Sequence, residues 1–448
     1  MSELAGKRVI VVGLGASGVA AARLCLRRGA HVVASDRKAA AELSDEALAL
    51  VAMGATLEVG GNAEEHIAEA DIVVLSPGVP RFAAVDDAEK RGIPIWGEVE
   101  LSTRSMAHAH PIVAIGGTNG KSTTASLVGE LLAAHGKHVF VGGNLGEPLA
   151  DHVDEPFDVV VLEVSSFQME RVDRFHPHVA ALLNVSDDHL DRYPTFDAYV
   201  RAKGNCFLRQ ETSDRAVVPS SDAICVREAK RGRARIETFG PGGTLDVTDD
   251  AVVDHTTEQR FARREWTLAG GHNALNVAAA IACVRPFDVA AETIRQVLRT
   301  FRGLPHRTAL VTELKGVRFY DDSKGTNVGA AVTALEGLRE ERVVLIAGGR
   351  DKGGSYEPLV AAMARKARAA VLIGEAAEAI ARAVGGRVPL ERASSMREAV
   401  RLGAALARPG DAVLLSPACS SFDMFRDYKD RGDEFARCVR SLEEEAVA

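Results

Sequence analysis

Short apolar runs alternate with Ala- and Leu-rich stretches along most of the chain, and this alternation constrains the fold more than any other feature. The runs are rich in β-branched residues and continuously apolar, which is typical of strands buried on both faces of a parallel sheet. The stretches between them suit crossover helices, so we predict an α/β fold. The expected strands are Arg8–Val12, His31–Ser35, Ile72–Ser76, Ile112–Ile115, Val159–Val164, Val179–Asn184, Val343–Ala347, Ala370–Ile373 and Ala412–Ser416.

The length of the chain predicts several domains. At 448 residues it exceeds one ordinary hydrophobic core, and we expect three domains. Seams near Ile95–Gly97 and Phe301–Pro305 each follow a complete group of α/β units. Between Ala216 and Thr267 the pattern becomes irregular, which predicts a small β-rich insertion. The expected domains are 1–97, 98–302 and 303–448.

Composition and charge exclude several classes of protein. No apolar run approaches the roughly 18 residues of a membrane helix. The N-terminal residues show no secretory signal pattern, so we expect a soluble, cytoplasmic protein without a membrane partner. A net charge of -8 argues against a nucleic-acid partner. The six cysteines include no C-x-x-C pair and predict neither a disulfide framework nor a zinc site.

A glycine-rich loop after the expected strand Ile112–Ile115 carries the strongest chemical signal. It reads Gly-Thr-Asn-Gly-Lys-Ser from Gly117 to Ser122, and a helix is expected to begin near Lys121. Glycines let backbone N–H groups converge on phosphate oxygens, the lysine meets the terminal phosphates, and the serine hydroxyl can bind Mg²⁺. The loop is one residue shorter than the standard spacing, because position 115 is Ile. We predict an ATP site; the alternative is a turn that binds nothing.

Polar side chains follow the next two expected strands. Glu163 lies at the end of Val159–Val164, where a Mg²⁺ ligand opposite a phosphate loop would sit. Asp187, Asp188, His189 and Asp191 follow the strand that ends near Asn184. Ligands gather at such strand ends in open α/β sheets, although solvated carboxylates and Asp-rich turns are common for structural reasons.

A second glycine pattern follows the first expected strand. Gly13, Gly15 and Gly18 have the spacing of a dinucleotide-binding fingerprint, and Asp36 ends the next strand. The pattern alone suggests NAD, but it is equally compatible with another nucleotide diphosphate.

The order and wording of these motifs resemble the Mur ligase family of bacterial cell-wall synthesis over nearly the whole chain. The resemblance implies a Rossmann-like UDP-binding domain, a central P-loop ATPase-type domain and a Rossmann-like C-terminal domain. It also implies ATP and Mg²⁺ as cofactors and small molecules as partners, and we expect a monomer. The matching segments are 117–123, 162–168, 184–194, 270–276 and 303–307.

Four segments resemble the branch of this family that adds D-glutamate to UDP-N-acetylmuramoyl-L-alanine. They are the N-terminal glycine fingerprint, 321–327, 415–423 and 431–435. The implied reaction activates the alanyl carboxylate with ATP as an acyl phosphate, which the glutamate amine then attacks. A domain closure that excludes water is expected to accompany it.

The resemblance assigns roles to individual residues. The implied ATP contacts are Gly117, Thr118, Asn119, Gly120, Lys121, Ser122, Thr123, Asn273, Asn276, Arg307 and Asp322. The implied UDP-substrate contacts are Gly15, Ser17, Asp36, Arg37, Ser76, Gly78, Asn144, Gln168 and His189. The implied D-glutamate contacts are Lys324, Thr326, Lys352, Ser421 and Tyr428.

Catalysis would rest on four residues, Lys121, Glu163, His189 and Lys203. In the implied arrangement Ser122 and Glu163 hold one Mg²⁺, and His189 holds a second together with Lys203, whose amine has become a carbamate. Without the resemblance, Lys203 is simply a lysine on a helix surface.

Five alternatives stay open. A sister ligase would share the ATP motifs but add another amino acid, and a close relative could accept L-glutamate. A folylpolyglutamate-synthetase-like enzyme would not need the first glycine fingerprint. A nicotinamide-dependent oxidoreductase would use that fingerprint and leave the loop Gly117–Ser122 unexplained. A regulatory nucleotide-binding protein would need no catalytic groups.

Overall fold

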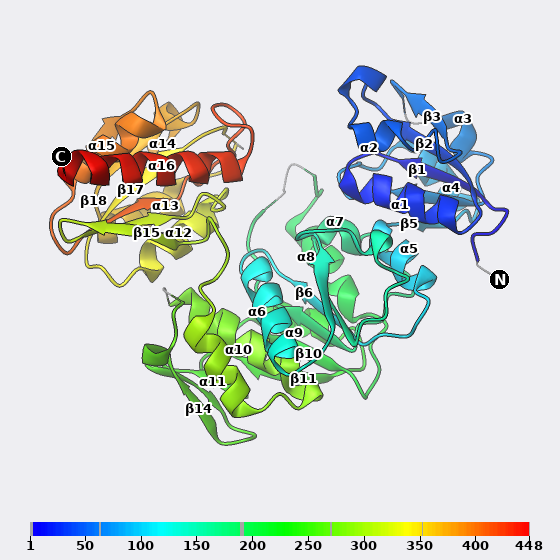
Figure 1. Cartoon of the computed structure of the whole chain (residues 1–448), viewed down its shortest axis with the longest axis horizontal. Coiled ribbons are helices and arrows are strands. Elements are labelled where there is room, and N and C mark those ends of the chain that lie inside the picture. The colour runs from blue at the N-terminus through cyan, green and yellow to red at the C-terminus, as the bar shows by residue number, and fades with distance from the viewer. Residues whose placement is uncertain (1–2, 62–63, 189–191, 269–270, 352, 448) are drawn as a thin grey trace. The chain divides into compact units, whose positions relative to one another are not determined.

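A computed structural model describes residues 3–61, 64–188, 192–268, 271–351 and 353–447 (Figure 1). The chain divides into two compact units, of which the first comprises 1–260 with 277–294 and the second 261–276 with 295–448. The domain boundaries expected near 97 and 302 stay predictions.

The N-terminal sheet has five parallel strands in the order β3-β2-β1-β4-β5. Val9 and Val11 of β1 belong to one hydrophobic cluster and Ile10 and Val12 to another, so both faces of the sheet are covered, as the continuous apolar run predicts. The strands are β1 Arg8–Val12, β2 His31–Asp36, β3 Thr56–Val59, β4 Ile72–Leu75 and β5 Ile95–Trp96. The helices are α1 Ala16–Arg27, α2 Asp45–Leu48, α3 Glu64–Ile67 and α4 Ala83–Lys90.

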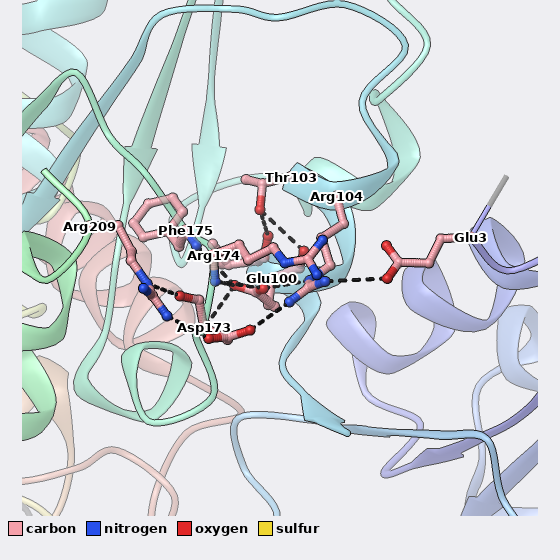
Figure 2. Close-up of polar contacts among 9 residues, drawn as sticks. Glu3, Glu100, Thr103, Arg104, Asp173, Arg174, Phe175 and Arg209 are labelled. Atoms are coloured by element: carbon pink, nitrogen blue, oxygen red, sulfur yellow. Dashed lines mark hydrogen bonds and ion pairs between the residues drawn. The ribbon is translucent and has the colours of Figure 1, made fainter. Parts of the chain in front are cut away.

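Helix α5, Glu98–Ser105, joins this sheet to the central one and is anchored by a buried carboxylate (Figure 2). Glu100 has no exposed surface and accepts hydrogen bonds from the backbone N–H groups of Asp173, Arg174 and Phe175 at 2.9 to 3.1 Å. The Nε of Arg104 donates to the same carboxylate at 2.6 Å. These bonds supply the paired partners that a buried charge requires.

The central sheet has nine strands in the order β14-β13-β12-β11-β10-β9-β6-β8-β7. Its strands from β7 to β12 are parallel, and β13 runs antiparallel to β12. The first strands are β6 Ile112–Gly116, β7 Val139–Gly143, β8 Val159–Glu163 and β9 Val179–Leu182, and the others are β10 Arg215–Pro219, β11 Arg235–Phe239, β12 Leu245–Val247, β13 Ala251–Asp254 and β14 Gln259–Ala262. The helices are α6 Lys121–Ala134, α7 Ser166–Met169, α8 Phe196–Gly204, α9 Ala223–Ala229, α10 His272–Val284 and α11 Ala291–Thr300.

The segment Ala216–Thr267 differs from the expected insertion. Its strands do not form a separate element, because β10 pairs in parallel with β9 and the following strands extend the central sheet. It also contains the helix α9, capped by the Asp222 side chain, which accepts from two N–H groups of the first turn. The strands β11, β12 and β14 are short and contain polar residues, so a search for long apolar runs did not detect that the sheet continues through them.

The C-terminal sheet lies in the second unit and has six strands in the order β15-β16-β20-β17-β18-β19, parallel except for the edge strand β15. Leu345 and Ala347 face one cluster, and Val344 and Ile346 face another. The strands are β15 Ala309–Leu314, β16 Val317–Asp321, β17 Val343–Gly348, β18 Ala367–Ile373, β19 Leu390–Arg392 and β20 Ala412–Leu415. The helices are α12 Val328–Gly337, α13 Glu357–Lys366, α14 Ala377–Val384, α15 Met396–Leu406 and α16 Tyr428–Val447.

All nine expected strands are present, so the α/β class is confirmed. The strands that the sequence did not predict include the two-residue β5, the strand β15, in which Leu310 and Glu313 are exposed, and the strand β10, of which four residues are buried. Within the described ranges, no helix combines the length and apolar character that a membrane span needs.

Candidate active site

The glycine loop after β6 has a backbone that glycine favours. Gly117 has a φ of 142° and Gly120 a φ of 85°, in the region that other residues rarely adopt. Helix α6 begins at Lys121, as predicted from the sequence. The loop therefore delivers the N-terminal N–H groups of a 14-residue helix, together with a lysine, to the carboxyl end of a buried strand.

Side chains from neighbouring strand ends hold the loop in place. The N–H of Asn119 donates to Asn184 Oδ1 at 2.9 Å, and Asn184 Nδ2 donates to the Asn119 carbonyl at 3.0 Å. The hydroxyl groups of Thr118 and Tyr199 lie 3.1 Å apart. These contacts tie the loop to the segment after β9 and to α8.

Glu163 lies beside the serine of the loop. Ser122 Oγ donates to Glu163 Oε2 at 2.5 Å, and Asn144 Nδ2 donates to Oε1 at 2.6 Å. Ser122 and Glu163 are both buried, at 3% exposure each. The structure brings together these two residues, expected to share a Mg²⁺, and adds Asn144, which the resemblance assigned to the UDP substrate.

Lys203 is a buried lysine of α8, not a surface one. It is 5% exposed, its Nζ donates to the Gly117 carbonyl at 2.7 Å, and the same nitrogen lies 4.6 Å from the centre of the Tyr199 ring. Burial, and then the positive charge of Lys121, hold the pKa of Lys203 well below its ordinary value. Lys121 Nζ donates to the Thr118 carbonyl at 2.8 Å. Lys121 on α6 and Lys203 on α8 therefore both donate hydrogen bonds to carbonyls of the loop after β6.

The histidine segment is only partly described. His189 and Asp191 lie outside the described residues, Asp187 is exposed and Asp188 half-buried. In the part of the chain that the structure covers, no group of three His, Cys, Asp or Glu side chains could hold a metal ion. The oxygens of Ser122 and Glu163 are nevertheless the hard ligands that Mg²⁺ prefers.

The glycine turn after β1 is closed by polar contacts. Asp36 accepts from the N–H of Leu14 at 2.7 Å, and Ser76 Oγ donates to the Gly13 carbonyl at 2.6 Å. A Cβ on Gly18 would lie 1.8 Å from that carbonyl oxygen, so only glycine fits there.

The other expected UDP contacts differ in their surroundings. A Cβ on Gly15 or Gly78 would meet open space. Gln168 is 2% exposed, and its side-chain oxygen accepts from the N–H of Ser165 at 2.9 Å, which caps α7. Ser17 is half-buried and Arg37 exposed.

In the second unit, two of the expected ATP contacts pair with each other, and a third, Asp322, accepts hydrogen bonds from its surroundings. Asn276 Nδ2 donates to Asn273 Oδ1 at 3.0 Å on the first turns of α10. Asp322 accepts from Ser416 Oγ at 2.7 Å and from the N–H of Thr308 at 3.1 Å. Burial raises the pKa of Asp322 to about 7, although Ser416 and Arg307 oppose the shift.

Two of the expected amino-acid contacts in the second unit, Lys324 and Tyr428, lie against each other. Lys324 Nζ lies 3.8 Å from the centre of the Tyr428 ring, and Ser323 Oγ donates to the Tyr428 carbonyl at 2.8 Å. Thr326 follows in the same turn, where its N–H donates to the Lys324 carbonyl at 2.8 Å. Lys352 lies outside the described residues.

Arg431 contacts the residues around Lys324 and Tyr428. The sequence placed it in the segment 431–435 but assigned it no role. It has no exposed surface, and it donates to Ser323 Oγ at 2.9 Å and to the carbonyls of Cys419 and Ser420 at 3.2 and 3.3 Å. Burial lowers its pKa to about 10. Tyr199 and Asn184 were likewise missed, since only spatial proximity to the loop after β6 identifies them.

These features agree with those of a known protein family. The chain matches the models for the Mur ligase MurD-like N-terminal domain at 7–97, the Mur ligase middle domain at 115–284 and the Mur ligase glutamate ligase domain at 306–419. Its three α/β sheets and phosphate loop define a nucleotide-dependent ligase of this type, and the chain belongs to the Mur ligase family.

The most informative relatives within the family are D-glutamate ligases. The chain is 44% identical to the UDP-N-acetylmuramoylalanine–D-glutamate ligase of Desulfosudis oleivorans, over 99% of this chain and 98% of that one. It is also 44% identical to the ligase of the same name from Anaeromyxobacter dehalogenans, over 97% and 98%. Among solved structures, it resembles the MurF ligase of Thermotoga maritima in complex with ADP, with a TM-score of 0.62, 17% identity and coverage of 99% and 100%. That likeness supports the fold alone.

Proposed function

We propose that this chain is an ATP-dependent ligase that joins D-glutamate to the alanyl carboxylate of UDP-N-acetylmuramoyl-L-alanine in peptidoglycan precursor synthesis. The observation that carries the proposal is the joint placement of Lys121, Ser122, Glu163 and Lys203 around one helix N-terminus, in a chain 44% identical to D-glutamate ligases. We further propose that it acts in the cytoplasm as a monomer, with domain boundaries near 97 and 302.

The loop residues 117–123 would bind the ATP phosphates. Their N–H groups and the helix N-terminus favour anions, and Lys121 supplies a full positive charge at the terminal phosphates. In the second unit, Asn273, Asn276, Arg307 and Asp322 would contact the rest of the nucleotide. The half-buried Arg307 and the low-exposure amides suit a polar ligand more than an apolar one.

Ser122 and Glu163 fit a Mg²⁺ ion, since their oxygens already converge at a hydrogen-bonding distance in a buried place. A second ion would be held by His189 and a carbamate on Lys203. When bound, Mg²⁺ would offset the repulsion between the substrate carboxylate and the γ-phosphate.

Lys203 fits carbamate formation because its surroundings favour the neutral amine. The Nζ lone pair attacks the carbon of CO₂ and forms an N–C bond, a proton leaves the nitrogen for solvent, and the carbamate keeps the negative charge. The change replaces a neutral amine beside Lys121 with an anion, which attracts the positive charge of Lys121.

The reaction steps follow from the charges on the substrates and on these residues. A carboxylate is too electron-rich for an amine to attack, so its oxygen first attacks the γ-phosphorus and ADP leaves with the bond electrons. Lys121 stabilises the charge that develops on the phosphoryl oxygens. The amine then attacks the acyl carbon, phosphate departs, and an amide remains.

Two further sets of residues would bind the other substrates. Gly15, Ser17, Asp36, Arg37, Ser76, Gly78, Asn144, Gln168 and His189 would contact the UDP-sugar. The open space at Gly15 and Gly78 would let a ligand approach the backbone closely. Lys324, Thr326, Lys352, Ser421 and Tyr428 would contact D-glutamate, whose two carboxylates suit the lysines.

Phosphate release from ATP tests the proposal. The purified chain is supplied with UDP-N-acetylmuramoyl-L-alanine and, in parallel, D-glutamate, L-glutamate, meso-diaminopimelate or L-lysine. We expect release with D-glutamate only. Release with another amino acid would assign the chain to a sister activity, and no release with any of the four would reject ligation of these substrates.

A further inference from the structure

Two loops of the second unit follow neighbouring strands of its sheet. Residues 349–356 follow β17 and residues 416–423 follow β20, and β17 pairs in parallel with β20. The carboxyl ends of parallel strands meet at one edge of a sheet, where ligands gather in open α/β folds. Ser421, a proposed contact of D-glutamate, belongs to the second of these loops.

Backbone hydrogen bonds join the two loops. The N–H of Gly348 donates to the Pro417 carbonyl at 2.9 Å, and the N–H of Arg350 donates to the Ser420 carbonyl at 2.9 Å. The Ser420 hydroxyl donates to the Arg350 carbonyl at 3.4 Å. The backbone directly before Ser421 therefore lies against the loop after β17.

Three side chains make a second connection between the loops. The Tyr356 hydroxyl donates to Asp351 Oδ1 at 2.8 Å, and its oxygen lies 3.3 Å from Cys419 Sγ. Asp351 Oδ1 also accepts from the N–H of Gly353 at 2.9 Å. Tyr356 and Cys419 are buried and Asp351 is half-buried. The tyrosine hydroxyl thus connects a carboxylate of the first loop to a thiol of the second.

The direction of these hydrogen bonds follows from the acceptors. Burial, and then the contacts with Cys419 and Asp351, raise the pKa of Tyr356, so its hydroxyl keeps its proton at neutral pH. The carboxylate of Asp351 accepts this proton, because an ionised oxygen is a stronger acceptor than sulfur. The thiol of Cys419 then donates to the Tyr356 oxygen, which retains acceptor capacity. Each of the three groups therefore depends on the next for its partner.

Ser421 lies two residues after Cys419 and is 2% exposed. We propose that Asp351, acting through Tyr356 and Cys419, positions Ser421 for the bound D-glutamate. A contact residue that is held in place before the ligand arrives loses less conformational freedom on binding. Asp351 and Tyr356 are positioning residues in this role, since they act through Cys419. The inference rests on the proposed function.

The Michaelis constants of the full-length chain test the proposal. Tyr356→Phe removes the hydroxyl and keeps the ring, so the KM for D-glutamate should rise about fivefold, with kcat and the KM for ATP within about twofold. Asp351→Ala should behave alike, whereas Asp351→Asn keeps an acceptor oxygen and should restore a KM near that of the unmodified chain. The matched control is Tyr320→Phe, which removes a buried hydroxyl that donates to Glu340 in the same unit. It should leave these constants unchanged.

A double variant tests whether the two side chains act together. Asp351→Ala combined with Tyr356→Phe should raise the KM for D-glutamate no further than the larger single change, because either change alone breaks the connection to Cys419. Independent effects would multiply to about 25-fold and would contradict the connection.

The outcomes separate this proposal from the proposed function. If the unmodified chain forms no amide with D-glutamate, the proposed function fails. If it forms amide and Tyr356→Phe leaves the KM for D-glutamate within about twofold, the positioning role is wrong. An equal rise in the KM for ATP would also reject positioning, since it would reveal a general structural role. If Tyr356→Phe does not fold, the comparison of Asp351→Ala with Asp351→Asn decides in the same way.

Discussion

The glycine turn after β1 and the glycine turn after β6 both join a buried parallel strand to a helix, and in each a loop carbonyl accepts a hydrogen bond from a side chain of another segment. After β1, the donor is the hydroxyl of Ser76, which reaches Gly13. After β6, the donor is the amine of Lys203, which reaches Gly117. A neutral donor supports the first turn and an ionisable one supports the second.

The glycines of the two turns serve different physical needs. Gly18 allows α1 to pack against the loop, because any side chain there would collide with the Gly13 carbonyl. Gly120 instead adopts a left-handed φ that places α6 and Lys121 at the strand end. Glycine therefore permits close packing in the first turn, which Asp36 closes, and permits the backbone conformation from which α6 begins in the second. Both turns are proposed to bind a nucleotide, but they use glycine differently.

The largest expected effect comes from removing the positive charge of Lys121 at the turn after β6, which should leave the turn after β1 unaffected. Lys121→Met should lower kcat by about 10³-fold or more, because it removes a cation from the phosphoryl group in the transition state. Binding of the UDP-sugar, measured by calorimetry, should stay within about twofold, since the first turn is untouched. Lys90→Met, at an exposed surface ion pair, is the control. A UDP-sugar affinity that fell with kcat would contradict the separation.

The next effect concerns the two side-chain donors. Lys203→Gln should lower kcat by about 10²-fold, because glutamine cannot become a carbamate. Removal of dissolved CO₂ should lower the activity of the unmodified chain and leave that of the variant unchanged. Ser76→Ala keeps Lys203, so its activity should fall on removal of CO₂ as that of the unmodified chain does. Equal responses to CO₂ in the unmodified chain and Lys203→Gln would reject a carbamate on Lys203.

A stability measurement tests the role of glycine in the first turn. Gly18→Ala should lower the free energy of unfolding by about 2 to 3 kcal/mol, because its Cβ meets a backbone oxygen that cannot move freely. Gly15→Ala has open space and an ordinary φ of -71°, so we expect a change within about 1 kcal/mol. Urea unfolding of both variants gives the comparison, and equal losses would show that packing does not distinguish the two glycines.

The smallest expected effect is a rise in melting temperature that identifies the nucleotide bound by the turn after β1. At a concentration about ten times its dissociation constant, UDP should stabilise the chain by about 1.4 kcal/mol, visible as a rise in melting temperature. NADH at the same concentration should give no rise. Stabilisation by NADH and not by UDP would restore the dinucleotide interpretation of Gly13, Gly15 and Gly18.

Much of the fold follows from the sequence because buried parallel strands are continuous apolar runs. The position of the phosphate loop follows as well, since Gly117, Gly120 and Lys121 lie between such a strand and a helix start. The burial of Lys203 does not follow. Its helix has ordinary amphipathic composition, and only the packing of α8 against the loop after β6 takes its amine out of water.

Some site contacts could not be predicted because they depend on strand order. Glu163 and Ser122 become neighbours because β8 pairs directly with β6, whereas β7, which lies between them in sequence, is placed at the edge of the sheet. Asn144 joins them because it follows β7, the other neighbour of β8. The position of Glu163 at a strand end suggested the first adjacency, and nothing in the sequence indicated the second.

The buried carboxylate of Glu100 limits where a fragment that contains the central sheet can begin. A fragment that starts at residue 115, where the match to the middle-domain model starts, would lack α5. The N–H groups of Asp173, Arg174 and Phe175 would then lose their acceptor. We therefore expect that a fragment of this region needs at least Glu98–Ser105, in addition to the segment from residue 115, in order to fold.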